Sequence, residues 1–294
     1  MFYIVLVFLG ACSYGILSTF VKLAYAKGFL ASEVIGSQLF FGCLMLWCGV
    51  LFFSRVKVNG KSILKLMLVG LTVCTTSIFY YVSLQTIPAS IAIVLLFQFT
   101  WIGVVLEAIV ERAFPSREKL VSIGILTAGT LLAGAVFEQG ESNLDIRGVM
   151  FGLSSALSFA LFIFFSGRVS VQIPSLNRSA FIATGSLISA FLILRPSFLV
   201  DGTLQEGLWV YGLLLGLFGL FIPTLFFAMG VPKIGSGLGT IVGAAELPMA
   251  VFMSSVVLGE TVTPLQWGGV VLILFGIAFP QWQLYHQKKR MPVL

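Results

Sequence analysis

Apolar residues in this chain fall in runs of about 20 residues, separated by short breaks rich in Gly, Pro and charged residues. A helix of about 20 apolar residues is long enough to cross the hydrocarbon core of a bilayer. The pattern predicts an all-α membrane protein with ten transmembrane helices. We place them at residues 2–24, 33–53, 66–85, 89–110, 118–137, 148–167, 175–194, 208–229, 234–258 and 265–284.

Composition excludes a soluble domain of this length. Of the 294 residues, 59% are hydrophobic and only 10% are charged, and the mean hydropathy is +1.07. A soluble domain carries about 25% charged residues, because charges coat its surface. The lipid bilayer is therefore the expected surroundings of the chain.

The net charge of +6 does not indicate a nucleic-acid partner, because the basic residues lie in the breaks between apolar runs. Positive charge in short loops holds those loops in the cytoplasm. With both termini cytoplasmic, most of the 17 Lys and Arg fall in inner segments, among them Lys57, Arg112, Arg178 and Lys288. An odd number of spans would place the basic carboxyl-terminal cluster outside.

The chain repeats itself weakly. Glu111–Pro115 and Glu260–Pro264 are both Glu-x-x-x-Pro, at an offset of 149 residues, and Ile87–Ser90 matches Lys233–Ser236 at an offset of 146. The acidic segment Glu138–Asp145 divides the ten spans into five and five. Because five is odd, the second half would enter the membrane from the opposite side, which is the arrangement of inverted repeats in transporters. The expected domains are residues 1–140 and residues 144–294.

A short motif precedes the last expected span, and shorter ones occur earlier. The motif residues are Leu258, Gly259, Glu260, Thr261, Pro264, Gln266 and Gly269, preceded by Asp145 with Gly148 and by Glu246 with Pro248. Together they resemble the drug/metabolite transporter superfamily in its ten-span form with two EamA-type repeats. The likeness covers nearly the whole chain, although Tyr14–Gly15 stands where the family commonly has Trp-Gly. It implies export or exchange of small metabolites, amino acids or drugs across a bacterial-type inner (plasma) membrane.

Glu246 is the leading candidate for a functional residue, because it lies near the middle of the ninth span. An unpaired charge there costs about 2.5–3.5 kcal/mol, and burial favours the neutral acid. A carboxyl that is neutral when dry and charged when wet can couple proton movement to transport, or it can receive a substrate amine. The alternative is a protonated, purely structural glutamate. Pro248 and Pro223 would weaken their helices and so mark helix breaks or gates.

Further candidates are polar or aromatic residues within spans. Tyr14, Ser18 and Lys22 share one face of the first helix. Lys22 either extends to the membrane surface or forms a gate with Glu33 or with an anionic substrate. Four residues in the third and fourth spans either line a substrate cavity or form interhelical hydrogen bonds; they are Thr76, Tyr80, Gln98 and Trp101.

Nothing in the sequence indicates an enzyme. The single histidine is His286, and no phosphate-binding loop, zinc-binding helix or pair of mid-span aspartates occurs. We therefore expect no cofactor and no metal. The sequence predicts a secondary active transporter for a small-molecule substrate, with proton coupling through Glu246 as an extension. A membrane-embedded enzyme, a flippase-like lipid-handling protein and a receptor or scaffold are the alternatives.

Overall fold

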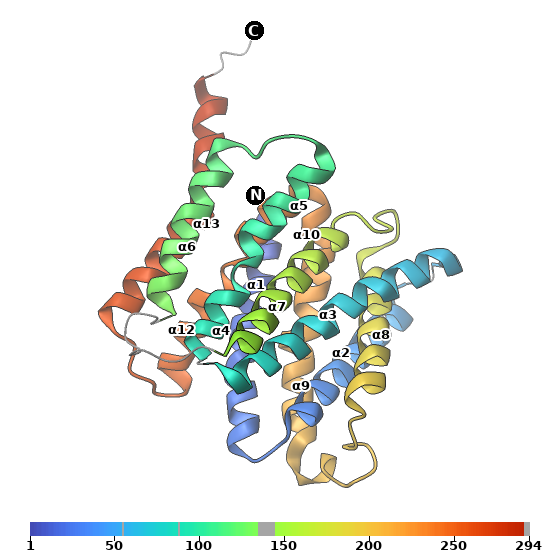
Figure 1. Cartoon of the computed structure of the whole chain (residues 1–294). Helices are drawn as coiled ribbons and strands as arrows, with labels where there is room; N and C mark the ends of the chain where they lie inside the picture. The colour runs from blue at the N-terminus through green and yellow to red at the C-terminus, as the bar shows by residue number, and fades with distance from the viewer. Residues whose placement is uncertain (55, 88, 135–144, 291–294) are drawn as a thin grey trace.

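The computed structural model describes residues 1–54, 56–87, 89–134 and 145–290, so most of the acidic segment Glu138–Asp145 lies outside the described residues. The described residues form helices joined by short loops, with no strand among them (Figure 1). The first half contains α1 (Phe2–Ala26), α2 (Ala31–Phe53), α3 (Gly60–Thr86), α4 (Ala89–Leu96), α5 (Phe99–Glu111) and α6 (Arg117–Ala133). The second half contains α7 (Ile146–Ser166), α8 (Ser175–Leu194), the π-helix η2 (Leu204–Leu208), α9 (Trp209–Gly216), the π-helix η3 (Leu217–Phe221), α10 (Ile222–Ile234), α11 (Ser236–Gly243), α12 (Glu246–Val257) and α13 (Pro264–Arg290).

Eight helical stretches among the described residues are long and apolar enough to cross a membrane. They coincide with eight of the ten expected spans. The other two expected spans correspond to α6, which has 17 residues, and to a shorter apolar stretch of α13, Pro264–Pro280. Large apolar side chains such as Phe52, Phe53 and Leu192 are exposed on the outside of the bundle. The chain is therefore an all-helical, multi-pass membrane protein.

Two expected spans are each divided into two helices. The span expected at 234–258 breaks between α11 and α12, at residues 244–245. The cause is Pro248, because it has no N–H for the carbonyl of Ala244 four residues before it, and that carbonyl instead accepts from the N–H of Leu247 at 3.4 Å.

The span expected at 89–110 breaks between α4 and α5, at residues 97–98, where the sequence offers no proline. The side-chain amide of Gln98 donates to the carbonyl of Val94 at 2.9 Å, and a side chain inserted into the helical hydrogen-bond ladder is a known cause of a break. The two breaks occupy corresponding places, because the separation of residues 98 and 245 falls between the two offsets at which the sequence repeats.

The span expected at 208–229 is part of a longer stretch, Leu204–Ile234, in which η3 interrupts the α-helix just before Pro223. Pro223 has no N–H for the carbonyl of Gly219, so that carbonyl is free to accept another donor. The side-chain amide of Gln38 on α2 donates to it at 3.3 Å. A freed carbonyl within a span thus finds a partner on a neighbouring helix, as the absence of water in a bilayer requires.

Arg178 plays a similar part and corrects an expectation. The sequence places it among the basic residues of an inner segment, whereas it is almost completely buried in the first turn of α8. Pro232 frees the carbonyl of Ala228, and Arg178 donates to that carbonyl at 3.0 Å and also to the carbonyl of Ser166 at the end of α7. Its charge therefore joins three helices rather than setting the orientation of a loop.

The helices of one half pack mainly against those of the other. The main neighbours are α1 with α10 and α12, α3 with α7 and α8, α2 with α8 and α9, α5 with α11, and α6 with α13. Figure 1 shows α6 and α13 side by side along one flank of the bundle, away from α2, α3 and α8. We call the face that holds Met1, Glu111 and Arg168 the N-terminal face, and the face that holds Lys22 and Glu260 the Lys22 face.

Glycine permits two of these crossings. A Cβ on Gly216 would lie 2.6 Å from the backbone nitrogen of Gly42, where α2 meets the end of α9. A Cβ on Gly70 would collide with the backbone carbonyl of Ile182 and would lie 2.6 Å from the nitrogen of Ser186, where α3 meets α8. Both crossings bring backbones together as closely as small residues do in membrane helix pairs.

Candidate functional site

A cavity of about 430 Å³ lies between the two halves, lined mainly by α1, α3 and α12. It reaches the surface on the Lys22 face, because Lys22 is a lining residue whose side chain is 55% exposed. Its volume falls in the range of small-molecule sites, about 300–1,000 Å³. The structure brings six of the predicted site residues together in its lining: Tyr14, Ser18, Lys22, Thr76, Tyr80 and Glu246.

Glu246 sits at the inner part of this cavity as the first residue of α12, directly after the break in the ninth span. Within the described part of the chain its carboxyl group makes neither a hydrogen bond nor an ion pair. The phenols of Tyr14 and Tyr80 lie within electrostatic reach of it. The N-terminal end of α12 favours a negative charge at this position, so the carboxyl group is available to a proton, water or substrate in the cavity.

Aromatic rings close the cavity toward the N-terminal face. The ring of Phe159 lies edge-to-face against Tyr14, with centroids 5.6 Å apart, and against Phe99, with centroids 4.7 Å apart. Phe162 stacks beside Phe159 at 6.0 Å. Phe99 and Phe162 are completely buried. These packed rings therefore separate Glu246 from the N-terminal face.

An ion pair lies at the mouth of the cavity. The Nζ atom of Lys22 is 2.8 Å from Oε1 of Glu260, and the hydroxyl of Ser254 donates to Oε2 of Glu260 at 2.7 Å. These two hydrogen bonds lower the pKa of Glu260, that from Lys22 most. The predicted pairing of Lys22 with Glu33 is wrong, because the carboxyl of Glu33 instead accepts from the backbone N–H of Leu30 at the start of its own helix, at 2.8 Å.

Gln98 and Trp101 do not line the cavity. The indole N–H of Trp101 donates to the side-chain oxygen of Gln98 at 2.8 Å, and Trp101 is 40% exposed. Gln98 acts at the break between α4 and α5. Both hydrogen bonds are local to this break, so among the described residues the two side chains neither line the cavity nor form the hydrogen bond to a neighbouring span that was the alternative.

Several lining residues were not singled out from the sequence. They include Tyr25, Gln38, Phe159 and Ser254. Aromatic side chains on lipid-facing and cavity-facing sides of a span look alike in a sequence, so only the helix orientations reveal them. The described residues contain no cluster of side chains that could hold a metal ion.

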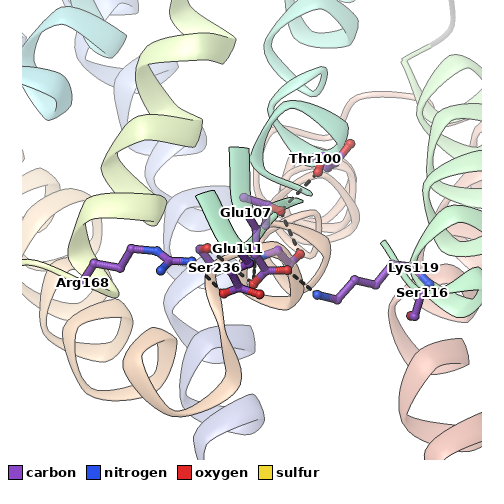
Figure 2. Close-up of polar contacts among 9 residues, drawn as sticks. Thr100, Glu107, Glu111, Ser116, Lys119, Arg168 and Ser236 are labelled. Atoms are coloured by element: carbon purple, nitrogen blue, oxygen red, sulfur yellow. Dashed lines mark hydrogen bonds and ion pairs between the residues drawn. The ribbon is translucent and has the colours of Figure 1, made fainter. Parts of the chain in front are cut away.

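Sequence reasoning also missed a buried carboxyl group. Glu107 on α5 accepts hydrogen bonds from the backbone N–H of Gly237 at 2.9 Å, the hydroxyl of Ser236 at 3.5 Å and the ammonium of Lys119 (Figure 2). Its side chain is only 7% exposed. Glu107 lies near the end of the span expected at 89–110, where a charged residue is ordinary. A carboxyl group inside that range could still have indicated a buried polar site.

Comparison with known proteins places the second half in a named family. Residues 146–280 match the EamA-like transporter family. The chain is 26% identical, over 245 residues, to the threonine/homoserine exporter RhtA of Escherichia coli (strain K12), which covers 80% of this chain and 77% of the exporter. An uncharacterized transporter of Synechocystis sp. is 24% identical over 229 residues, covering 78% of this chain and 70% of that transporter.

A solved crystal structure has the same fold, with a TM-score of 0.73 at 14% identity, over 94% of this chain and 98% of the other. The helical bundle, the family match and the relatives all indicate a membrane transport protein. Transport rather than catalysis is the activity of such proteins. The chain is therefore a membrane transporter whose residues 146–280 match the EamA-like transporter family.

Proposed function

We propose that this protein is a secondary exporter or exchanger of small amphipathic metabolites, amino acids or drugs, working by alternating access in the inner (plasma) membrane. The observation that carries the proposal is Glu246, a carboxyl group without a protein partner among the described residues, in a cavity open to one face and closed to the other. A carrier must offer its site to one side at a time.

The chemistry of the cavity supports an amphipathic substrate. Tyr14, Tyr80 and Phe159 offer aromatic surface, while Ser18 and Thr76 offer hydroxyl groups. The carboxyl of Glu246 suits a substrate ammonium group. Because one relative is named a threonine/homoserine exporter, amino acids are the first substrates to test.

The two halves, residues 1–140 and 144–294, are proposed to be inverted repeats. Helix pairing supports this. Exchanging α1 with α7, α2 with α8, α3 with the stretch from α9 to α10, α4 with α11, α5 with α12, and α6 with α13 maps most of the main pairs onto one another. The pair α3–α7 maps onto α10–α1, α3–α8 maps onto α9–α2, and α1–α12 maps onto α7–α5, while α2–α8 and α6–α13 map onto themselves. The two glycine crossings also correspond, because Gly70 and Gly216 are separated by the same offset as Ser90 and Ser236.

Proton coupling is proposed through Glu246 as well. The carboxyl would bind a proton when the cavity opens to one side and release it at the other. The basic residues of the loops favour cytoplasmic termini, which places the N-terminal face on the cytoplasmic side.

Counterflow of labelled threonine, homoserine and further amino acids in proteoliposomes tests the function. Glu246→Gln should abolish uptake driven by a pH gradient, because the amide cannot carry a proton, and it should leave substrate exchange measurable. Glu206→Gln, an exposed glutamate outside the cavity, is the matched control. Wild-type rates of gradient-driven uptake in Glu246→Gln would disprove the role of this carboxyl group.

A further inference from the structure

Two ion pairs hold corresponding positions on opposite faces of the bundle. One joins Lys22, near the end of α1, to Glu260 after α12, and the other joins Arg168, just after α7, to Glu111 at the end of α5. Both distances are 2.8 Å. Lys22 and Arg168 are separated by one of the two offsets at which the sequence repeats, and Glu111 and Glu260 are separated by the other. The same pair therefore occurs once in each orientation.

Each pair crosses between the halves. Lys22 belongs to the first half and Glu260 to the second, whereas Arg168 belongs to the second and Glu111 to the first. Exchanging the halves turns one pair into the other. All four side chains are between 35% and 55% exposed, and exposed ion pairs are weak. They can therefore break and reform easily during a transport cycle.

The N-terminal face has an additional buried carboxylate connection, for which the described residues of the Lys22 face show no counterpart. Figure 2 shows Glu107 and Glu111 between Arg168 on one side and Lys119 on the other. Glu107 ties α5 to the first turn of α11 through Gly237, and it binds Lys119 of α6. A Cβ at Gly235 would lie 2.9 Å from Oε1 of Glu107, so the contact depends on glycine there.

The residue that corresponds to Glu107 in the second half is Ser254, because their separation along the chain falls between the two repeat offsets. The hydroxyl of Ser254 donates to Glu260, but it cannot gather several donors from the opposite half as a carboxylate does. In the part of the chain that the structure describes, the Lys22 face thus has the ion pair without a counterpart of the Glu107 connection, and the cavity reaches the surface there. The face with the additional Glu107 connection is thus the closed one, and the face without it is the open one.

We propose that Arg168–Glu111, supported by Glu107, is the gate that holds the N-terminal face shut, and that Lys22–Glu260 is the corresponding gate of the Lys22 face. Both ion pairs are formed in the observed conformation, so the Glu107 connection is what distinguishes the closed N-terminal face from the Lys22 face. This inference rests on the alternating-access mechanism proposed above. It adds four gating residues and one positioning residue, Glu107.

The test measures access to the cavity from each face, without any substrate. Ser77, a lining residue, is replaced by cysteine in a protein whose four native cysteines are replaced by alanine. A membrane-impermeant maleimide is then applied to vesicles of either orientation. The reference protein should be labelled from the Lys22 face.

Arg168→Gln and Glu107→Gln should each raise labelling from the N-terminal face about tenfold, because a minor conformer of a few per cent becomes a major one. The exchanged pair, Glu111→Arg with Arg168→Glu, should return labelling to the reference value. Arg195→Gln removes an exposed arginine of the Lys22 face and is the matched control. Lys22→Gln should leave N-terminal-face labelling unchanged while slowing substrate exchange about tenfold, because the Lys22 face no longer seals.

Unchanged labelling in both Arg168→Gln and Glu107→Gln would overturn the inference, as would failure of the exchanged pair to restore it or an equal rise in Arg195→Gln. A rise in N-terminal-face labelling in Lys22→Gln would also overturn it. Counterflow by the reference protein separates this result from the proposed function. If exchange occurs but the labelling pattern fails, only the gates are wrong. If no substrate exchanges at all, the proposed function itself is wrong.

Discussion

At the scale of single residues, buried polar side chains in this protein donate hydrogen bonds to backbone carbonyls that prolines leave without a helical donor. Arg178 donates to the carbonyl freed by Pro232 and to the end of α7, and Gln38 donates to the carbonyl freed by Pro223. A membrane interior offers no water to such carbonyls. The sequence positions of the prolines therefore determine where polar side chains are needed on neighbouring helices.

Replacing Arg178 by methionine should destabilise the protein by about 2–4 kcal/mol, because two buried carbonyls lose their donor and each such loss costs about 1–3 kcal/mol. Methionine keeps much of the volume, so the effect reports on hydrogen bonding. Arg195→Met, at an exposed position, should change stability by less than about 0.5 kcal/mol. Denaturation in detergent micelles measures both, and equal stabilities of the two variants would contradict the role assigned to Arg178.

The sequence identified some residues well and others poorly, for physical reasons. Glu246 stood out because a carboxyl in the middle of an apolar span is rare. Glu107 was missed because it lies within one turn of an expected span end, where charge is ordinary. Arg178 was misplaced because an arginine near the start of a helix resembles the basic residues of loops in a sequence. Its two carbonyl partners belong to other helices and cannot be recognised from the sequence. Lys22 was recognised, but its partner Glu260 lies far away in the second half of the chain.

At the scale of helices, the breaks in the fourth and ninth spans determine where the site lies. Glu246 begins α12 because the helix is interrupted at residues 244–245. Pro248 made the ninth-span break predictable. The fourth-span break was not predicted, since Gln98 is no standard helix breaker and acts only through its side-chain contact with Val94.

Pro248→Ala should restore the N–H that pairs with the carbonyl of Ala244 and so join α11 to α12. We expect a gain in stability of about 1 kcal/mol, the net contribution of one hydrogen bond, together with slower substrate exchange because the helix no longer bends. Pro264→Ala, at the first residue of α13, is the control, since a proline there removes no helical bond. Thermal denaturation and counterflow on the same preparations supply the two readouts, and unaltered exchange in Pro248→Ala would rule out a role for the break.

At the scale of the whole molecule, the packing joins the halves rather than stabilising each alone. Length and hydropathy predicted the all-helical bundle and nearly all its helix positions. They could not predict which helices are neighbours, because lipid-facing and partner-facing apolar residues are alike in composition. Neighbouring helices are determined in part by glycines such as Gly70 and Gly216, which allow close approach only to one particular partner backbone.

Residues 1–140 and residues 144–294, expressed together as two chains, should assemble and exchange substrate, because the main interfaces lie between them. Either chain expressed alone should be unstable in the membrane. Co-purification through a tag on one chain, followed by counterflow, measures the outcome. Stable accumulation of either half by itself would show that packing within a half is sufficient.

The pairing of α6 with α13 has a consequence for synthesis. When the ribosome has delivered α6 to the bilayer, its main partner does not yet exist, since α6 begins at Arg117 and α13 only at Pro264. The first five spans must then wait in lipid with their polar and glycine-lined surfaces uncovered. Every molecule therefore passes through an incomplete form that membrane proteases can degrade and insertion chaperones can bind. Slow translation between the two halves should prolong this form and lower the yield of complete transporter.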